Sequence, residues 1–258
     1  MLNVRFKIFA DRIAAMPDQI TDGRNLREGY IRACGLQYGD IGESLSKDPL
    51  FQLAHKAASG RTVVISPSLA NLYVMIRYFM DGLPFGHIAE FGSYRGGSAL
   101  FMATILKHTN PKMKVYAFDT FQGMPTTDGK RDSVRDGDFA DVNLDEIRET
   151  ARRLQLDNIE FIQGTFEETL PAAIDRIGPL RLVHIDCDIF TGIETSYTYS
   201  KKAMVPGAYI VLDDALHSTC IGAFEAAERF MIREDGLHAE QNYPHLVFRH
   251  PFHDARRG

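Results

Sequence analysis

From residue 86 onward, short apolar runs alternate along the chain with segments of helical periodicity. The apolar runs lie at residues 87–91, 114–118, 159–163, 181–185, 208–212 and 245–249. The helical segments lie between and after them, at residues 98–108, 143–154, 168–177, 192–204 and 221–232. Strands and helices that alternate at this spacing form βαβ units with parallel strands. The pattern therefore predicts an α/β fold built on a mostly parallel sheet.

The composition sets the class of protein. The chain has 258 residues, of which 45% are hydrophobic and 24% are charged, as in a globular protein with a large core. A net charge of -5 argues against a nucleic-acid-binding protein, which usually has a basic face. We find neither an apolar stretch long enough for a membrane span nor the apolar core of a signal peptide. We therefore expect a cytoplasmic protein that binds neither nucleic acid nor membranes.

Two regions differ from the βα pattern. Residues 1–61 are polar with helical segments and turn signals, and we expect them to form an N-terminal cap or lid on a main domain at residues 62–258. Residues 120–143 are rich in Gly, Pro, Asp and Ser and have little periodicity. A loop of this length inside a compact domain is usually a lid or a binding loop.

Polar or glycine-rich residues follow five of the predicted strands. They lie at residues 90–98, 118–123, 163–168, 185–190 and 212–217. In an open parallel sheet, ligands bind beyond the carboxyl ends of the strands, which all lie at one edge. The sequence therefore predicts a ligand site at this edge.

The first two strand ends favour a nucleoside cofactor. Gly92, Gly96 and Gly97 do not have the dinucleotide spacing, and by themselves they fit a tight turn equally well. Asp119 lies at the tip of the next strand, where an acid accepts hydrogen bonds from a ribose. Glu90 would repel a diphosphate but suits a sulfonium, which favours S-adenosylmethionine over NAD.

Two of the predicted strands end in pairs of acids. Asp186 and Asp188 follow one strand, and Asp213 and Asp214 follow another. Four like charges brought together must be compensated, although aspartates after strands can instead cap the next helix. Strand alternation would place Asp186 and Asp188 on one side and Cys187 on the other.

The other titratable side chains near the acids have simpler interpretations. His184 lies within a strand and is interpreted as a core histidine rather than a ligand, and His217 fits either a loop residue or an acceptor contact. The cysteines, Cys34, Cys187 and Cys220, are far apart and predict neither a disulfide nor a thiolate zinc site.

Five stretches, taken together, are similar to a known family. They are IAEFGSYRGGSALFMA from residue 88, VYAFDTFQGMP from 115, IEFIQGTFEETLP from 159, VHIDCDIF from 183 and PGAYIVLDD from 206. Their order and spacing resemble the macrocin O-methyltransferase family, over residues 62–232. The resemblance implies a Rossmann-like class I methyltransferase with a mostly parallel seven-stranded sheet and helices on both faces. It also implies a homo-oligomer that uses S-adenosylmethionine and a metal to methylate hydroxyls of antibiotic sugars.

The resemblance assigns roles to residues at matching positions. The turn after the first strand would hold the methionine part of the cofactor, Asp119 the ribose, and residues 164–166 the adenine. The implied cofactor contacts are Glu90, Phe91, Gly92, Ser93, Tyr94, Gly97, Ser98, Asp119, Thr120, Phe121, Gly164, Thr165, Phe166 and Asp186. Asp186, Asp213 and Asp214 would bind the metal, and Asp188 would be the general base. Because these ligands are all oxygens, we expect Mg²⁺, with Mn²⁺ and Ca²⁺ as alternatives, rather than zinc.

The acceptor, a hydroxylated small molecule, stays open. Phe190 stands where the family usually has Tyr, beside the expected acceptor position. A catechol-type O-methyltransferase acting on an aromatic diol is the alternative within enzymes. A nicotinamide-dependent oxidoreductase is disfavoured by the glycine spacing and Glu90. A non-catalytic cofactor-binding module is disfavoured by Asp188 and the complete metal set.

Overall fold

The computed structural model describes residues 20–21, 24–25, 41–217 and 219–252, and the chain divides into two compact units after Pro49. In the first unit, strands β1 (Ile20–Thr21) and β2 (Arg24–Asn25) pair antiparallel, and helix α3 spans Ile41–Lys47. Most of the cap predicted for residues 1–61 lies outside the described residues, so that domain boundary stays a prediction.

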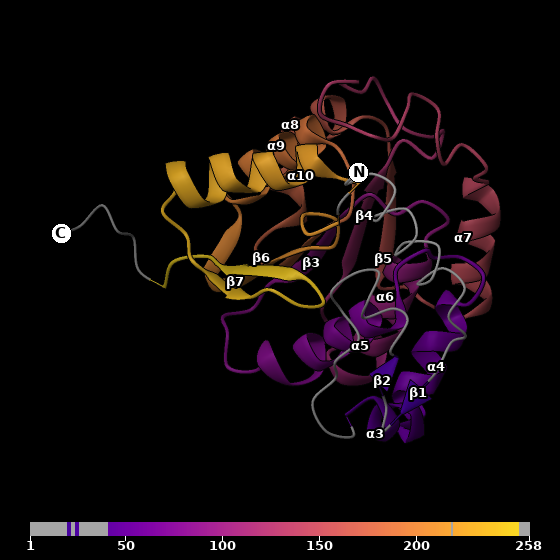
Figure 1. Ribbon diagram of the computed structural model, residues 1–258. Helices are drawn as coiled ribbons and strands as arrows, with labels where there is room; N and C mark the ends of the chain where they lie inside the picture. Colours follow the sequence, from indigo (N-terminus) through magenta and orange to yellow (C-terminus); the bar gives the residue numbers. More distant parts are fainter. Residues whose placement is uncertain (1–19, 22–23, 26–40, 218, 253–258) are drawn as a thin grey trace. The chain divides into compact units, whose positions relative to one another are not determined.

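The second unit is built on a seven-stranded sheet with the order β5-β4-β3-β6-β7-β9-β8 (Figure 1). Its strands are β3 (His87–Phe91), β4 (Val115–Asp119), β5 (Ile159–Gln163), β6 (Leu180–Ile185), β7 (Met204–Leu212), β8 (Ala239–Gln241) and β9 (Leu246–Arg249). Strands β3 to β7 pair in parallel, whereas β9 runs antiparallel to both of its neighbours. The predicted mostly parallel, seven-stranded sheet is confirmed.

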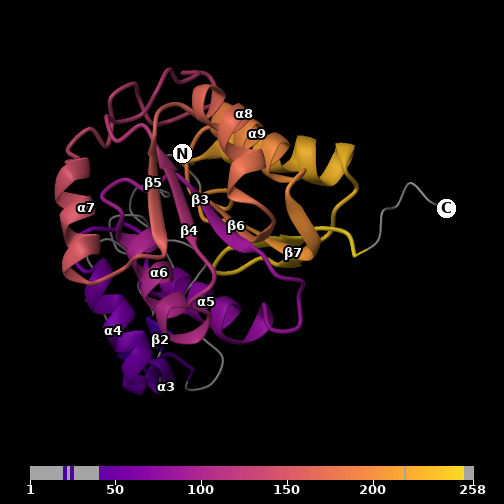
Figure 2. The same cartoon turned by 180° about the vertical axis from the view of Figure 1, so that it is seen from behind.

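Helices cover both faces of this sheet (Figures 1 and 2). One face carries α4 (Pro49–Ala58), α5 (Ser66–Val74), the π-helical η1 (Met75–Phe79), α6 (Gly97–Thr109) and α7 (Leu144–Arg153). The other carries α8 (Phe166–Ile177), α9 (Phe190–Ser200), α10 (Ile221–Ala226) and the π-helical η2 (Ala227–Glu234). This division follows from right-handed crossovers, because the chain advances from β3 to β5 and then returns to β6 and β7.

Apolar strand residues hold the sheet between the two helical layers. Phe91, Phe118 and Ile185 are fully buried in the core cluster beneath α8 and α9. Burying a side chain of this size contributes about 1.5–3 kcal/mol. Because the strands are fixed in this way, the positions of the residues at their carboxyl ends are fixed too.

The strand order reverses between β3 and β6, and the backbones that leave these two neighbouring strands approach closely there. The Gly92 N–H, after β3, donates to the Phe118 carbonyl of β4 (2.9 Å). The Asp186 N–H, after β6, donates to the Phe91 carbonyl of β3 (2.8 Å). Gly92 has φ +89°, and a Cβ atom on it would lie 1.7 Å from the Asp186 carbonyl oxygen. Only glycine fits at this close approach, because the positive φ disfavours other residues and a Cβ atom would clash.

We expect Gly92→Ala to lower the free energy of unfolding by about 2–5 kcal/mol, the combined cost of a left-handed alanine and of overpacking. Urea denaturation at equilibrium would measure this loss. Gly129→Ala is the matched control, because a Cβ atom on Gly129 meets nothing within 4 Å. If the two variants were equally stable, the close approach of Gly92 to the Asp186 carbonyl would be contradicted.

Candidate active site

Asp119, at the end of β4, organises the turn that follows β3. Its Oδ2 accepts the N–H groups of Ser93 and Tyr94 (both 2.8 Å), and its Oδ1 accepts the N–H of Phe121 (2.6 Å). Tyr94 and Phe121 have φ +47° and +51°, values that are uncommon outside glycine. Burial raises the pKa of Asp119, while these backbone donors stabilise its anion.

Glu90 lies in the sheet just before this turn and is fully buried. It pairs in register with His184 of β6, and its Oε1 lies 3.1 Å from the His184 Nδ1. The Ser93 hydroxyl donates to Oε2 at 2.7 Å. Both carboxylate oxygens therefore have partners within the protein, on the face of the sheet that carries α5.

The end of β5 also joins this region. The Gly164 N–H donates to the Asp119 carbonyl at 3.0 Å, and Thr165 begins α8 with a capping box that includes Glu168. The ring of Phe166 meets that of Phe91 edge to face, with centroids 5.6 Å apart. The structure thus brings the predicted cofactor residues of the first three strand ends to one edge of the sheet.

The start of α6 closes this region from the other side. The Gly97 N–H donates to the Arg61 carbonyl at 3.2 Å, and a Cβ atom on Gly97 would lie 2.6 Å from Thr62. Ser98 is buried in the same turn of α6. Gly97 therefore allows the backbone of residues 61–62 to approach the helix.

The predicted acids do come together. Carboxylate oxygens of Asp186, Asp213 and Asp214 lie within 4.8 Å of one another, and Asp214 Oδ2 accepts the N–H of Asp188 at 3.0 Å. Burial, followed by repulsion from the neighbouring carboxylates, raises the pKa of both Asp186 and Asp214. We refer to these three carboxylates, Asp186, Asp213 and Asp214, as the acid cluster.

Asp188 reaches the acid cluster through a turn rather than through strand alternation. Strand β6 ends at Ile185, and Asp188 has φ +60°. The Ile189 N–H donates across it to the Cys187 carbonyl at 2.6 Å, which is a γ-turn. Cys187 is buried, as predicted, and burial is the main reason that the pKa of Asp188 is raised. Strained conformations of this kind are often found at functional sites.

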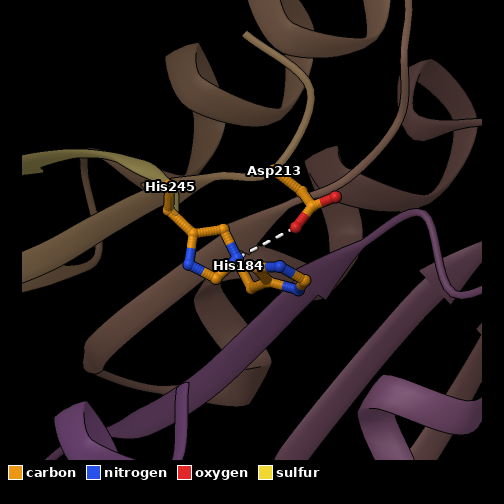
Figure 3. Close-up of side chains that lie close together, drawn as sticks. All are labelled: His184, Asp213 and His245. Carbon is orange, nitrogen blue, oxygen red and sulfur yellow. Dashed lines mark ion pairs between the residues drawn. The ribbon is translucent and has the colours of Figure 1, made fainter. Parts of the chain in front are cut away.

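Asp213 contacts a histidine that the sequence pattern did not mark as functional. Its Oδ1 lies 2.9 Å from the His245 Nε2, and the His184 ring lies beside the same pair (Figure 3). Burial raises the pKa of Asp213, but interactions with His245, His184 and Ser68 together outweigh it and bring the pKa to about 2. Burial lowers the pKa of His245, whose Nδ1 lies 2.9 Å from the Asn71 Nδ2. From the sequence, His245 was only the first residue of the last strand.

Residues 120–143 contain no helix or strand, in agreement with the predicted loop. Buried Asp132 accepts the N–H of Phe190 at 3.1 Å, and the Arg131 guanidinium lies 4.4 Å from the centroid of the Phe190 ring. Phe190 is itself buried and packs against Phe230. The loop is therefore anchored beside Asp188, and the Phe190 ring is enclosed by other side chains.

The same loop is also anchored beside the turn that follows β3, residues 92–96, which is predicted to hold the cofactor and which we call the cofactor turn. The Tyr94 hydroxyl donates to Asp141 at 2.7 Å, and the Arg95 guanidinium pairs with the Asp141 carboxylate. The Phe139 ring lies 5.4 Å from that of Tyr94. The loop thus links the cofactor turn to the start of α9. Nothing in the sequence pattern distinguished Asp132 or Asp141 from the other acids of the loop.

His217 is exposed, and its Nδ1 lies 3.0 Å from the Thr219 hydroxyl. It therefore has a local partner in the loop after β7. Across the part of the chain that the structure describes, none of the helices is both long and apolar enough to cross a membrane.

Residues 52–238 match the family described as Macrocin-O-methyltransferase (TylF). The chain belongs to this family. A Streptomyces olivaceus protein named 8-demethyl-8-(2,3-dimethoxy-alpha-L-rhamnosyl)-tetracenomycin-C 4'-O-methyltransferase is 30% identical over 171 residues. That match covers 62% of this chain and 64% of the relative, so less than two thirds of the relative is spanned.

Solved structures share the fold. The O-methyltransferase NovP superposes with a TM-score of 0.65 at 21% identity, covering 82% of this chain and 95% of NovP. The O-methyltransferase TomG from Streptomyces achromogenes, described in complex with SAM, has a TM-score of 0.51 at 17% identity, covering 79% and 88%. Together with the strand order, these likenesses show the class I methyltransferase fold.

We expect Asp214→Asn to raise the melting temperature of the metal-free protein at pH 8. The pKa of Asp214 is higher in the folded protein than in the unfolded protein. The wild type therefore loses stability as the pH rises from the unfolded-state pKa through the folded-state pKa. Asparagine removes this loss but keeps an oxygen that accepts the Asp188 N–H. Each kcal/mol gained in the free energy of unfolding should raise the melting temperature by about 2–4 °C. The gain should shrink as the pH falls toward 4. Thermal unfolding in EDTA from pH 4 to pH 8 would measure the difference in melting temperature between Asp214→Asn and the wild type. A difference that does not change with pH would contradict repulsion among the carboxylates.

Proposed function

We propose that the protein is an S-adenosylmethionine-dependent O-methyltransferase that methylates a hydroxyl group of a glycosylated natural product in antibiotic biosynthesis. One observation carries the proposal. Asp186 contacts the cofactor turn through its backbone, at Gly92, and joins the acid cluster through its side chain. A methyl donor held by the turn would therefore lie next to the acids.

The cofactor turn fits a nucleoside. Of the two Asp119 oxygens, Oδ2 already accepts two backbone N–H groups, whereas Oδ1 accepts one at 2.6 Å and a Thr120 hydroxyl only at 3.5 Å. A carboxylate has about four acceptor sites, so Oδ1 keeps room for one ribose hydroxyl. Asp119 would thus shape the turn and bind the ribose at the same time.

The acid cluster fits a hard dication. Its donors are all oxygens and lie close together. The raised pKa values of Asp186 and Asp214 indicate that protons are the alternative way to relieve the repulsion between the carboxylates. Asp186, Asp213 and Asp214 would hold Mg²⁺, with Mn²⁺ as the nearest alternative. When bound, such an ion makes a coordinated hydroxyl more acidic.

In the proposed reaction, the acceptor oxygen forms a bond to the methyl carbon as the carbon–sulfur bond breaks. The electron pair of that bond stays on sulfur, which leaves neutral S-adenosylhomocysteine. The hydroxyl proton passes to the Asp188 carboxylate. Burial raises the pKa of Asp188 toward the working pH, as suits a general base. Most of the remaining catalysis is positioning of the acceptor in line with the methyl group.

The relative that methylates a rhamnosyl 4'-oxygen supports a sugar hydroxyl as the acceptor. The deciding experiment is a screen of the purified protein with S-adenosylmethionine, Mg²⁺ and a panel of glycosides and catechols, followed by mass spectrometry. We expect glycosides to gain one methyl group, EDTA to abolish transfer and Mg²⁺ to restore it. Preferential methylation of catechols would refute the acceptor class, and full activity after exhaustive chelation would refute the metal.

We expect Asp119→Ala to weaken binding of S-adenosylhomocysteine by about 1–3 kcal/mol, since it removes a ribose partner and the acceptor of three backbone donors. Isothermal titration calorimetry would measure the affinity. Asp157→Ala, at an exposed position, is the control and should bind as the wild type does. Equal affinity of the two variants would contradict the ribose assignment.

We expect Asp188→Asn to reduce turnover by about 10²–10⁴-fold, the usual contribution of a general base, while cofactor and Mg²⁺ affinities stay close to those of the wild type. Asp186→Asn should instead lose Mg²⁺ affinity together with turnover, because Asp186 belongs to the acid cluster. Mg²⁺ titrations of both variants would separate these roles. The reverse pattern would exchange the assignments of Asp186 and Asp188.

A further inference from the structure

Beside the acid cluster, three side chains with buried polar atoms converge. In each of them, one buried atom lacks a hydrogen-bond partner among the described residues: Nε2 of His184, Nε2 of His245 and Oδ1 of Asp213. Each of these side chains also offers one ligand atom within 4.8 Å of those of the other two (Figure 3). Both histidines are fully buried. The shortest of these contacts, 2.9 Å between Asp213 Oδ1 and His245 Nε2, lacks the alignment of a hydrogen bond among the described residues. Asp213 and His245 have this ion pair, whereas His184 Nε2 has no partner among the described residues. Leaving such an atom unpaired in a protein interior is costly, so the convergence needs a cause.

The other nitrogen of each imidazole does have a partner. His184 Nδ1 lies 3.1 Å from the Glu90 carboxylate, and His245 Nδ1 lies 2.9 Å from the side-chain amide of Asn71. Metal-binding histidines are usually held in this way, because a partner on one ring nitrogen fixes the orientation and tautomer of the other. The Asn71 amide can present its oxygen to Nδ1 by turning over, since its two ends are nearly equivalent in shape.

The geometry points to a second metal site, in which His184 Nε2, His245 Nε2 and Asp213 Oδ1 bind one divalent transition-metal ion. Two imidazoles and one carboxylate suit Zn²⁺, Co²⁺ or Ni²⁺, whereas Mg²⁺ prefers oxygen ligands. The histidine site and the acid cluster therefore select different classes of ion. Asp213 belongs to both, and its two oxygens allow it to serve both.

Only small movements would complete this site. Ligands about 2.0–2.2 Å from a tetrahedral ion are about 3.3–3.6 Å apart, so the widest pair has to close by no more than about 1.5 Å. Three protein ligands leave a fourth position that water can fill. His184 lies in β6, Asp213 directly follows β7, and His245 directly precedes β9. The ion would therefore join three neighbouring strands and fix the orientation of Asp213.

The test is a Co²⁺ titration of untagged, chelator-stripped full-length protein in the presence of excess Mg²⁺, which occupies the acid cluster. We expect visible absorption bands that saturate at one Co²⁺ per chain. His184→Gln and His245→Gln should each weaken Co²⁺ binding by at least about tenfold. His217→Gln, a change at an exposed histidine after the same strand as Asp213, should bind Co²⁺ as the wild type does.

Asp186→Asn separates this proposal from the proposed function. This variant should lose Mg²⁺ affinity and methyl transfer but still bind Co²⁺. Equal Co²⁺ affinity in the wild type and in His245→Gln would overturn the site. Loss of Co²⁺ binding in Asp186→Asn, with binding kept in both histidine variants, would also overturn it. If circular dichroism shows that the histidine variants are unfolded, X-ray absorption on Zn²⁺-loaded wild type decides. Two imidazoles around the ion support the site, and a shell of oxygen alone refutes it.

Discussion

The site depends on the way in which the chain leaves β3 and β6. After β3 it continues into α6 on one face of the sheet, and after β6 it continues into α9 on the opposite face. A crevice opens at such a reversal of strand order, and ligands of open α/β sheets bind there. Because Gly92 has no side chain, the Asp186 carbonyl can pack against it at the base of this crevice. The cofactor turn and the acid cluster are neighbours for this reason.

A buried polar layer supports the acids from the face that carries α5. Glu90, Ser93 and His184 are linked by contacts of 2.7 and 3.1 Å, and Asn71 contacts His245. Polar groups of this kind are costly to bury unless they are paired, so each pairing restricts the strand or helix that carries it. The layer can therefore hold the acid-bearing strand ends in one arrangement, at some cost in stability.

The sequence was informative wherever function depends on local order along the chain. The apolar runs predicted β3 to β7 and β9, and they therefore predicted that Asp119 and the four aspartates lie at or just after strand ends at one edge of the sheet. It was uninformative about β8, a short edge strand of exposed and half-buried residues that has no apolar pattern. Alternation assumed that β6 continues through Asp188, whereas the strand ends at Ile185 and Asp188 lies in a turn with positive φ. Asn71 and His245 are 174 residues apart, and no local pattern records a contact that only the folded sheet creates.

The loop at residues 120–143 is held at two separated points, by Asp132 at the start of α9 and by Asp141 at the cofactor turn. Between these anchors, residues 135–138 form a turn of exposed residues that is bonded back to Met124 and Thr127. The anchors, in contrast, are tied to Phe190 and Tyr94, which lie next to the predicted site residues. Under the proposed function, evolution or protein engineering could therefore vary the exposed side chains of residues 135–138 to admit acceptors of different shape while both anchors stay in place.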